Sequence, residues 1–130
     1  MAKAPERSTA RGALDRLVRG TDPWVAVGDF LDDWRHADPE ERPRLMADPI
    51  EVPTNLEHLR WASLLAAAVD WLCWQDGLPR PAWVYRAEWI LEEPWFLYPG
   101  WRLRAWQLME TPAPLKMRNI FSGDRIFQRV

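Results

Sequence analysis

The chain has 130 residues, of which 48% are hydrophobic and 28% charged, and its formal net charge is −2 at pH 7. This length suits one domain with its own core, and the apolar content excludes a globally disordered chain. The longest nearly apolar run, residues 61–69, is far shorter than the roughly 20 residues that cross a bilayer, so no membrane segment is expected.

The cysteine content favours a reducing compartment. The single cysteine, Cys73, lies in an apolar stretch and has no second cysteine with which to form a disulfide or a zinc site. No apolar leader follows the basic first residues. We therefore expect a cytoplasmic protein in which Cys73 is a buried, unreactive thiol.

The charges are distributed unevenly along the chain. Residues 1–20 carry five basic and two acidic groups, a net +3, and residues 101–130 carry six and two, a net +4. Residues 21–100 carry six basic and fifteen acidic groups, a net −9. Two explanations stay open: the basic ends pair with the acidic middle of the same fold, or they face nucleic acid or an acidic partner.

The first half of the chain predicts a tail followed by two helices. Residues 1–20 are expected to be a flexible basic tail, with a short helix possible over 13–19. Asp22 and Pro23 form a helix start signal, and the apolar spacing that follows predicts a helix to about residue 36. A second start at Pro39 predicts a short helix to residue 47, and the prolines of residues 48–53 predict a linker.

The second half predicts a long central helix and shorter ones after it. Thr54 and Glu57 have the spacing of a capping box, and a broad apolar face over residues 55–76 predicts a helix at the centre of the domain. Further segments are expected as helices at 83–92 and 101–109, an aromatic loop at 94–100 and a helical turn or two at 112–118. The predicted fold is all-α: a compact single domain over residues 21–130, a bundle of about five proline-punctuated helices with an irregular C-terminal segment.

Ten tryptophans are the most unusual feature of the composition. Trp34, Trp61 and Trp106 lie on helical apolar stripes, which predicts that they belong to the core. Another five, Trp74 among them, gather around proline-bound connections, where tryptophan is typical of a binding surface. The residues predicted to bind a partner are Trp83, Trp89, Trp95, Phe96, Tyr98 and Trp101.

No catalytic residue, metal site or cofactor is predicted. His36 and His58 lie on separate predicted elements without metal-ligand spacing, and no phosphate-binding glycine loop or nucleotide fingerprint is present. One alternative is a small enzyme that uses carboxylates of the first long helix, which are Asp29, Asp32 and Asp33. Another is a nucleic-acid-binding module that uses the basic residues of the C-terminal segment, which are Lys116, Arg118, Arg125 and Arg129.

Several short motifs occur in an order typical of a known group of domains. They are Phe30-Leu31-Asp32-Asp33, Asp76-Gly77-Leu78-Pro79-Arg80-Pro81-Ala82-Trp83, Pro94-Trp95-Phe96, Leu103-Arg104-Ala105, Thr111-Pro112-Ala113-Pro114 and Arg118-Asn119-Ile120-Phe121. Over residues 24–130 the chain resembles uncharacterised bacterial antitoxin-like domains, often fused to helix-turn-helix regulators and encoded beside nucleotidyltransferase-type toxins. The resemblance implies a non-catalytic interaction domain that restrains a protein partner of the kind such toxins represent. Residues 1–23 are too short for a helix-turn-helix, which leaves only the partner-binding half of that role.

Overall fold

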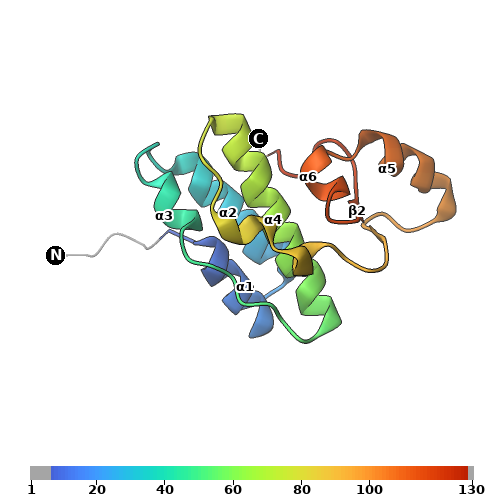
Figure 1. Ribbon diagram of the computed structural model, residues 1–130, viewed down its shortest axis with the longest axis horizontal. Helices are drawn as coiled ribbons and strands as arrows, with labels where there is room; N and C mark the ends of the chain where they lie inside the picture. The colour runs from blue at the N-terminus through green and yellow to red at the C-terminus, as the bar shows by residue number, and fades with distance from the viewer. Residues whose placement is uncertain (1–6, 129–130) are drawn as a thin grey trace. The chain divides into compact units, whose positions relative to one another are not determined.

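The structure, a computed structural model, describes residues 7–128 (Figure 1). The fold is all-α, as predicted: the described residues form six α-helices, and strand is confined to two segments of two residues each. None of the helices in this part of the chain has both the length and the apolar character that a bilayer crossing requires. The chain divides into two compact units, residues 7–51 and 52–128, and the boundary falls in the predicted linker.

The first unit begins with helix α1, Ala10–Val18, where we expected a flexible tail. Thr9 caps the helix by accepting a hydrogen bond of 2.9 Å from the Gly12 N–H. Ala10, Ala13, Leu14 and Leu17 are buried, and α1 packs against α2. The two alanines complete an apolar stripe that the larger residues alone did not reveal. Residues 1–6 of the predicted tail lie outside the described residues.

Helix α2 spans Pro23–His36 and confirms the predicted start signal, because the Asp22 carboxylate accepts from the N–H groups of Trp24 and Val25. Its buried stripe includes Phe30 and Trp34, as the spacing predicts. Helix α3, Arg42–Met46, begins later than expected. The residues before it form a turn instead, in which the Glu41 N–H donates to the Asp38 carbonyl over 2.8 Å.

The second unit is built around helix α4, Leu56–Asp76. Asn55 caps it in place of the expected Thr54, and Gly77 ends it in the left-handed conformation at φ 67°. Between Trp61 and Cys73 every residue except Trp71 is buried, so α4 has no solvent-exposed face there. The prediction of a long, broadly apolar helix over residues 55–76 is therefore confirmed.

The prediction of a helix over residues 83–92 is wrong. The segment forms two short 3₁₀ turns, η1 over Ala82–Tyr85 and η2 over Ala87–Trp89. Side chains donate hydrogen bonds to carbonyls that would accept from backbone N–H groups in an α-helix. The Trp89 indole donates to the Trp83 carbonyl over 2.7 Å, and Arg118 donates to the Val84 carbonyl over 2.7 Å. Both turns pack against α4.

The remaining elements of the second unit follow in short succession. Strand β1, Trp95–Phe96, lies in the expected aromatic loop and pairs in parallel with β2, Ile120–Phe121. The helices between them confirm the predictions for 101–109 and 112–118, and they are η3, Trp101–Leu103, which runs into α5, Arg104–Glu110, and then α6, Ala113–Lys116. Helix α6 packs against α4 and β2, and in Figure 1 α5 lies on the side of α6 away from α4.

Candidate protein-binding surface

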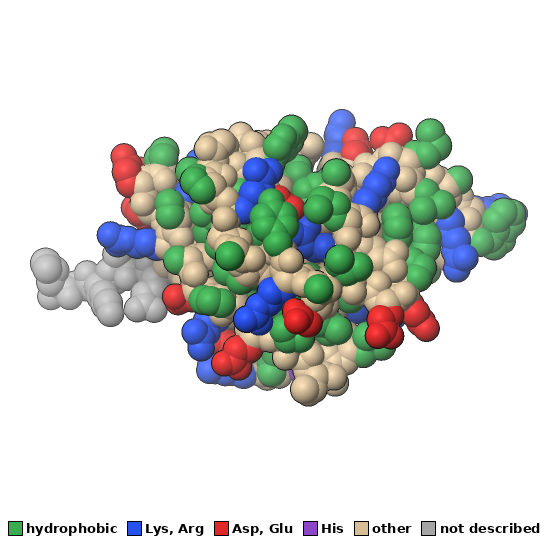
Figure 2. Space-filling view, viewed as in Figure 1, with side chains coloured by type: hydrophobic (Ala, Val, Ile, Leu, Met, Phe, Trp, Pro, Cys, Tyr) green, Lys and Arg blue, Asp and Glu red, His purple; other side chains and the backbone are tan. Residues whose placement is uncertain are grey.

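The segment from Tyr98 to Met109 exposes an unusual amount of apolar side chain. Trp101 is 76% exposed and Met109 77%, although both are large apolar residues. We call the exposed apolar residues of this segment the α5 surface, which consists of Tyr98, Trp101, Leu103, Trp106, Leu108 and Met109. Figure 2 shows hydrophobic side chains beside basic ones where Figure 1 places α5. A run of exposed apolar side chains of this kind is typical of an interaction site.

The surface exists because α5 buries a polar residue. Gln107 is the one buried residue between positions 101 and 110. Its amide accepts from the Tyr98 N–H over 3.1 Å and donates to the Tyr98 carbonyl over 3.0 Å and to the Leu103 carbonyl over 3.2 Å. The inward side of α5 therefore fixes the preceding loop by hydrogen bonds, and its apolar residues face outward.

The predicted partner-binding residues divide into three groups. The expectation of exposure is wrong for Trp83 and Trp89, which are buried, Trp89 completely. Trp95 and Phe96 are half-buried, because their rings pack on those of other residues of the same unit. Tyr98 is exposed, as the prediction requires, and so is Trp101.

One predicted core tryptophan, Trp106, is in fact exposed, whereas the predicted core positions of Trp34 and Trp61 are confirmed. The ring of Trp106 packs against Tyr98 at 5.6 Å between centroids and lies close to Gly123. Helical spacing correctly placed it on a helix. That spacing did not show that the inward position of this helix belongs to Gln107 instead.

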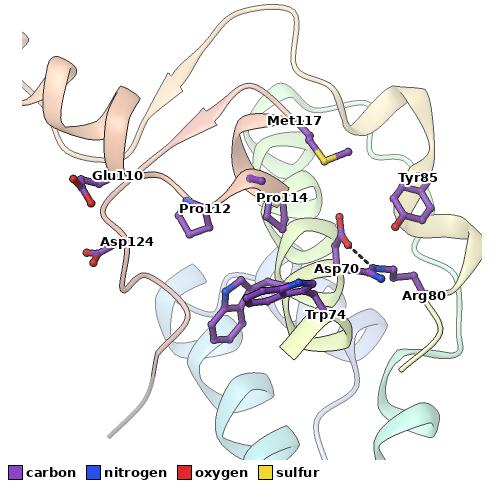
Figure 3. A pocket seen from close by; sticks show the side chains of 11 residues that line it. Asp70, Trp74, Arg80, Tyr85, Glu110, Pro112, Pro114, Met117 and Asp124 are labelled. Atoms are coloured by element: carbon purple, nitrogen blue, oxygen red, sulfur yellow. Dashed lines mark hydrogen bonds and ion pairs between the residues drawn. The ribbon is translucent and has the colours of Figure 1, made fainter. Parts of the chain in front are cut away.

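A pocket of about 500 Å³ lies elsewhere in the same unit, and we call it the Trp74 pocket. Its apolar lining comes from α4, η1 and the region of α6: Trp71, Trp74, Tyr85, Pro112, Pro114 and Met117. Figure 3 shows these side chains together with those of Ala113 and of four charged residues, which complete the lining. Trp74 is 66% exposed, which agrees with its assignment to the tryptophans outside the core.

A buried carboxylate, that of Asp70, forms part of the lining of the Trp74 pocket. Asp70 accepts from Arg80 over 2.8 Å and from Arg118 over 3.1 Å. Arg118 is only 3% exposed, and burial lowers its pKa, while the hydrogen bond to Asp70 raises the pKa of Arg80. Arg118 also donates to the Val84 and Pro114 carbonyls, so one side chain fixes η1 and α6 to α4.

Of the four basic C-terminal residues predicted to contact nucleic acid, the structure contradicts one, Arg118. The expectation of an outward contact is wrong for Arg118, whose charge is satisfied inside the fold by the acidic Asp70. Lys116 and Arg125 are exposed, and Lys116 donates to the Met109 carbonyl over 3.3 Å. Arg129 lies outside the described residues. Arg118 thus agrees with the alternative in which the basic ends of the chain pair with acidic groups of the same fold.

Two carboxylates of α2 form contacts with other residues of the first unit. Asp29 forms an ion pair of 2.9 Å with Arg16 of α1, and Asp33 accepts from the Ser8 N–H over 2.6 Å. Both are half-buried, as is Asp32. Within residues 7–128 no group of three or more acidic, histidine or cysteine side chains is arranged to hold a metal ion.

Cys73 is fully buried in α4, and burial raises the pKa of its thiol from 9.0 to about 11. This is the buried thiol that the apolar context predicts. A protonated thiol is a poor nucleophile, which argues against covalent chemistry at this residue.

No protein-family model, characterised protein or solved structure matches the chain. The resemblance to antitoxin-like domains therefore stays a prediction.

Proposed function

We propose that this chain is a non-catalytic protein-binding module that restrains a partner through the α5 surface. The observation that carries the proposal is the inverted arrangement of η3 and α5, in which Gln107 of α5 is buried while Trp101 of η3 and Met109 of α5 face solvent. Placing large apolar groups outward costs solubility, and a partner that covers them gives this arrangement a role. Tryptophan, tyrosine and methionine are enriched at protein interfaces.

The α5 surface also has the form of a binding site centred on one residue. Trp101 contributes a large rigid side chain that loses little conformational freedom on binding, as is typical of residues that dominate interface energies. Arg102 and Arg104 are exposed beside it, and the Arg104 guanidinium lies 5.2 Å from the centre of the Phe96 ring. The partner best suited to this surface presents an apolar groove with acidic groups at its edge.

The class of partner comes from the resemblance, which implies a nucleotidyltransferase-like toxin. An antitoxin-type module needs no cofactor and no catalytic residue, since it acts by occupying its partner. The buried thiol Cys73 supports a reducing, cytoplasmic setting for such a complex.

The proposal is tested by capturing the tagged chain from its native host with and without the changes Trp101→Ser and Met109→Ser. We expect the unaltered chain to recover a partner in stoichiometric amount. Loss of Trp101 alone is expected to cost about 2–4 kcal/mol of binding energy, so the double variant should lose the partner. Titration of the purified partner with both chains then measures the change in affinity.

The matched control replaces two apolar residues that are at least half exposed but lie outside the α5 surface. Val25→Ser and Leu56→Ser meet this condition, and we expect this variant to bind as the unaltered chain does. Recovery of no stoichiometric partner, or equal binding by the double variant, would refute the proposal.

A further inference from the structure

The Trp74 pocket is not explained by binding at the α5 surface. Tyr85 and Met117 at the pocket are more than half exposed, like Trp74. The pocket therefore presents open aromatic and thioether side chains around a hollow of about 500 Å³. Concave apolar sites with a few convergent polar groups are typical of ligand-binding sites.

Acidic groups outnumber basic ones in the lining of the pocket, which includes Asp70, Glu110 and Asp124 but only one base, Arg80. Asp70 pairs with both Arg80 and Arg118, so these three groups together carry one positive charge and leave Asp70 no role in attracting a ligand. Glu110 and Asp124 also line the pocket, and within the described residues neither forms an ion pair. Figure 3 shows these two carboxylates on one side of the pocket and Arg80 and Tyr85 on the other. A ligand at the side of Glu110 and Asp124 is favoured if it is positively charged.

The aromatic lining favours the same charge. The face of an indole or phenol ring attracts a cation, and tryptophan does so most strongly. Trp71 and Trp74 come from α4 and Tyr85 from η1, so aromatic rings reach the pocket from two different elements. Carboxylates together with aromatic faces suit a guanidinium group, which is planar, weakly hydrated and able to donate two parallel hydrogen bonds to a carboxylate.

We propose that the Trp74 pocket binds an arginine side chain presented by a partner protein, stacked on Trp74 with its guanidinium directed at Glu110 and Asp124. The long apolar stem of arginine is suited to the proline and methionine side of the pocket. The inference rests on the proposed function in one respect only, which is that a protein partner supplies the arginine. The pocket itself is tested without that partner.

The experiment titrates the purified full chain with N-acetyl-L-arginine amide and follows the indole N–H signals of Trp71 and Trp74 by NMR. N-acetyl-L-citrulline amide is the matched probe, because it has nearly the same shape without the charge. We expect saturable shifts with the arginine probe and at least about tenfold weaker binding of the citrulline probe. This comparison uses the unaltered chain and does not depend on how any variant folds.

Variants then locate the bound group. Glu110→Gln combined with Asp124→Asn should weaken binding of the arginine probe about tenfold. Glu92→Gln combined with Glu93→Gln changes the net charge equally at exposed positions that do not line the pocket, and should leave binding unchanged. Trp74→Ala should abolish the shifts of the Trp71 signal, whereas Trp101→Ala should preserve them.

Equal binding of the two probes, equal weakening by the two acidic double variants, or no shift of either indole signal would each overturn the inference. Free L-arginine that binds more tightly than the blocked probe would indicate a site for the amino acid itself and would also overturn it. If the arginine probe binds as expected while the host yields no partner, the pocket is supported and the proposed function fails. The two proposals can therefore fail separately.

Discussion

At the scale of single residues, the Asp70 carboxylate organises the second unit by accepting from two arginines of different segments. We predict that Asp70→Asn lowers the free energy of unfolding by roughly 3–5 kcal/mol, because the charge of buried Arg118 is then left without compensation. Urea denaturation followed by circular dichroism measures the change. Asp48→Asn, at an exposed position, is the control and should stay within about 0.5 kcal/mol of the unaltered chain. A loss below 1 kcal/mol for Asp70→Asn would contradict the prediction.

Cys73 gives a prediction about pH. Its pKa is raised to about 11 by burial, so the protonated thiol persists well above the pH at which an ordinary cysteine ionises. At pH 8 the folded chain should hold about 100-fold less thiolate than the unfolded chain. We expect a disulfide reagent to react at least that much more slowly without urea than with it, and the folded-state rate to keep rising above pH 9. Equal rates in the two conditions would show that the thiol is accessible.

At the scale of elements, the two long helices α2 and α4 could be predicted because each combines a start signal with an apolar face of several turns. The segment 83–92 could not, because the partners of its carbonyls include Arg118, which follows Val84 by 34 residues. Local spacing contains no information about such a distant donor. The position of α5 was predictable from the helical spacing of its apolar residues, but its inward side was not, since a buried glutamine breaks the usual rule of apolar burial.

Gln107 provides the test of this inverted element. Gln107→Met keeps the volume but removes both hydrogen bonds to Tyr98. We predict a loss of about 1–2 kcal/mol in unfolding free energy and faster hydrogen exchange at the Tyr98 amide, because the helix no longer holds the loop. Gln75→Met, at an exposed site on α4, should change neither quantity. Unchanged exchange at Tyr98 in the Gln107 variant would show that the loop is held by other contacts.

At the scale of the whole molecule, the candidate site was predictable only in part. The surplus of tryptophan indicated a binding surface, and two of the six proposed residues, Tyr98 and Trp101, lie on the exposed α5 surface. Leu103, Leu108 and Met109 were missed, because ordinary helical spacing cannot tell an outward apolar stripe from an inward one. The Trp74 pocket was missed for a different reason: its lining joins residues from positions 70 to 124, and only the folded chain brings them together.

The exposure of the α5 surface predicts how the whole protein behaves in solution. Trp101→Ser with Met109→Ser should leave the unfolding free energy within about 0.5 kcal/mol, since neither side chain belongs to the core. The same variant should be more soluble and bind less of an apolar dye in its native state. Dye fluorescence beside a urea titration tests both statements. A large loss of stability would mean that these residues are buried in solution.

The hydrogen bond between Asp70 and Arg118 also has a consequence for the time course of synthesis. The two residues are 48 positions apart, so at about 5–20 residues per second a ribosome takes about 2–10 s to go from one to the other. During that interval helix α4 exists without its most buried counter-charge, and a carboxylate in that condition is more stable in water than inside an apolar core. The pair of Asp70 with Arg118 can therefore form only after translation has passed Arg118, whereas its pair with Arg80 becomes available 38 residues earlier. Until then the second unit also lacks the hydrogen bonds by which Arg118 joins η1 and α6 to α4, so its final packing is completed last, by a residue near the end of the unit.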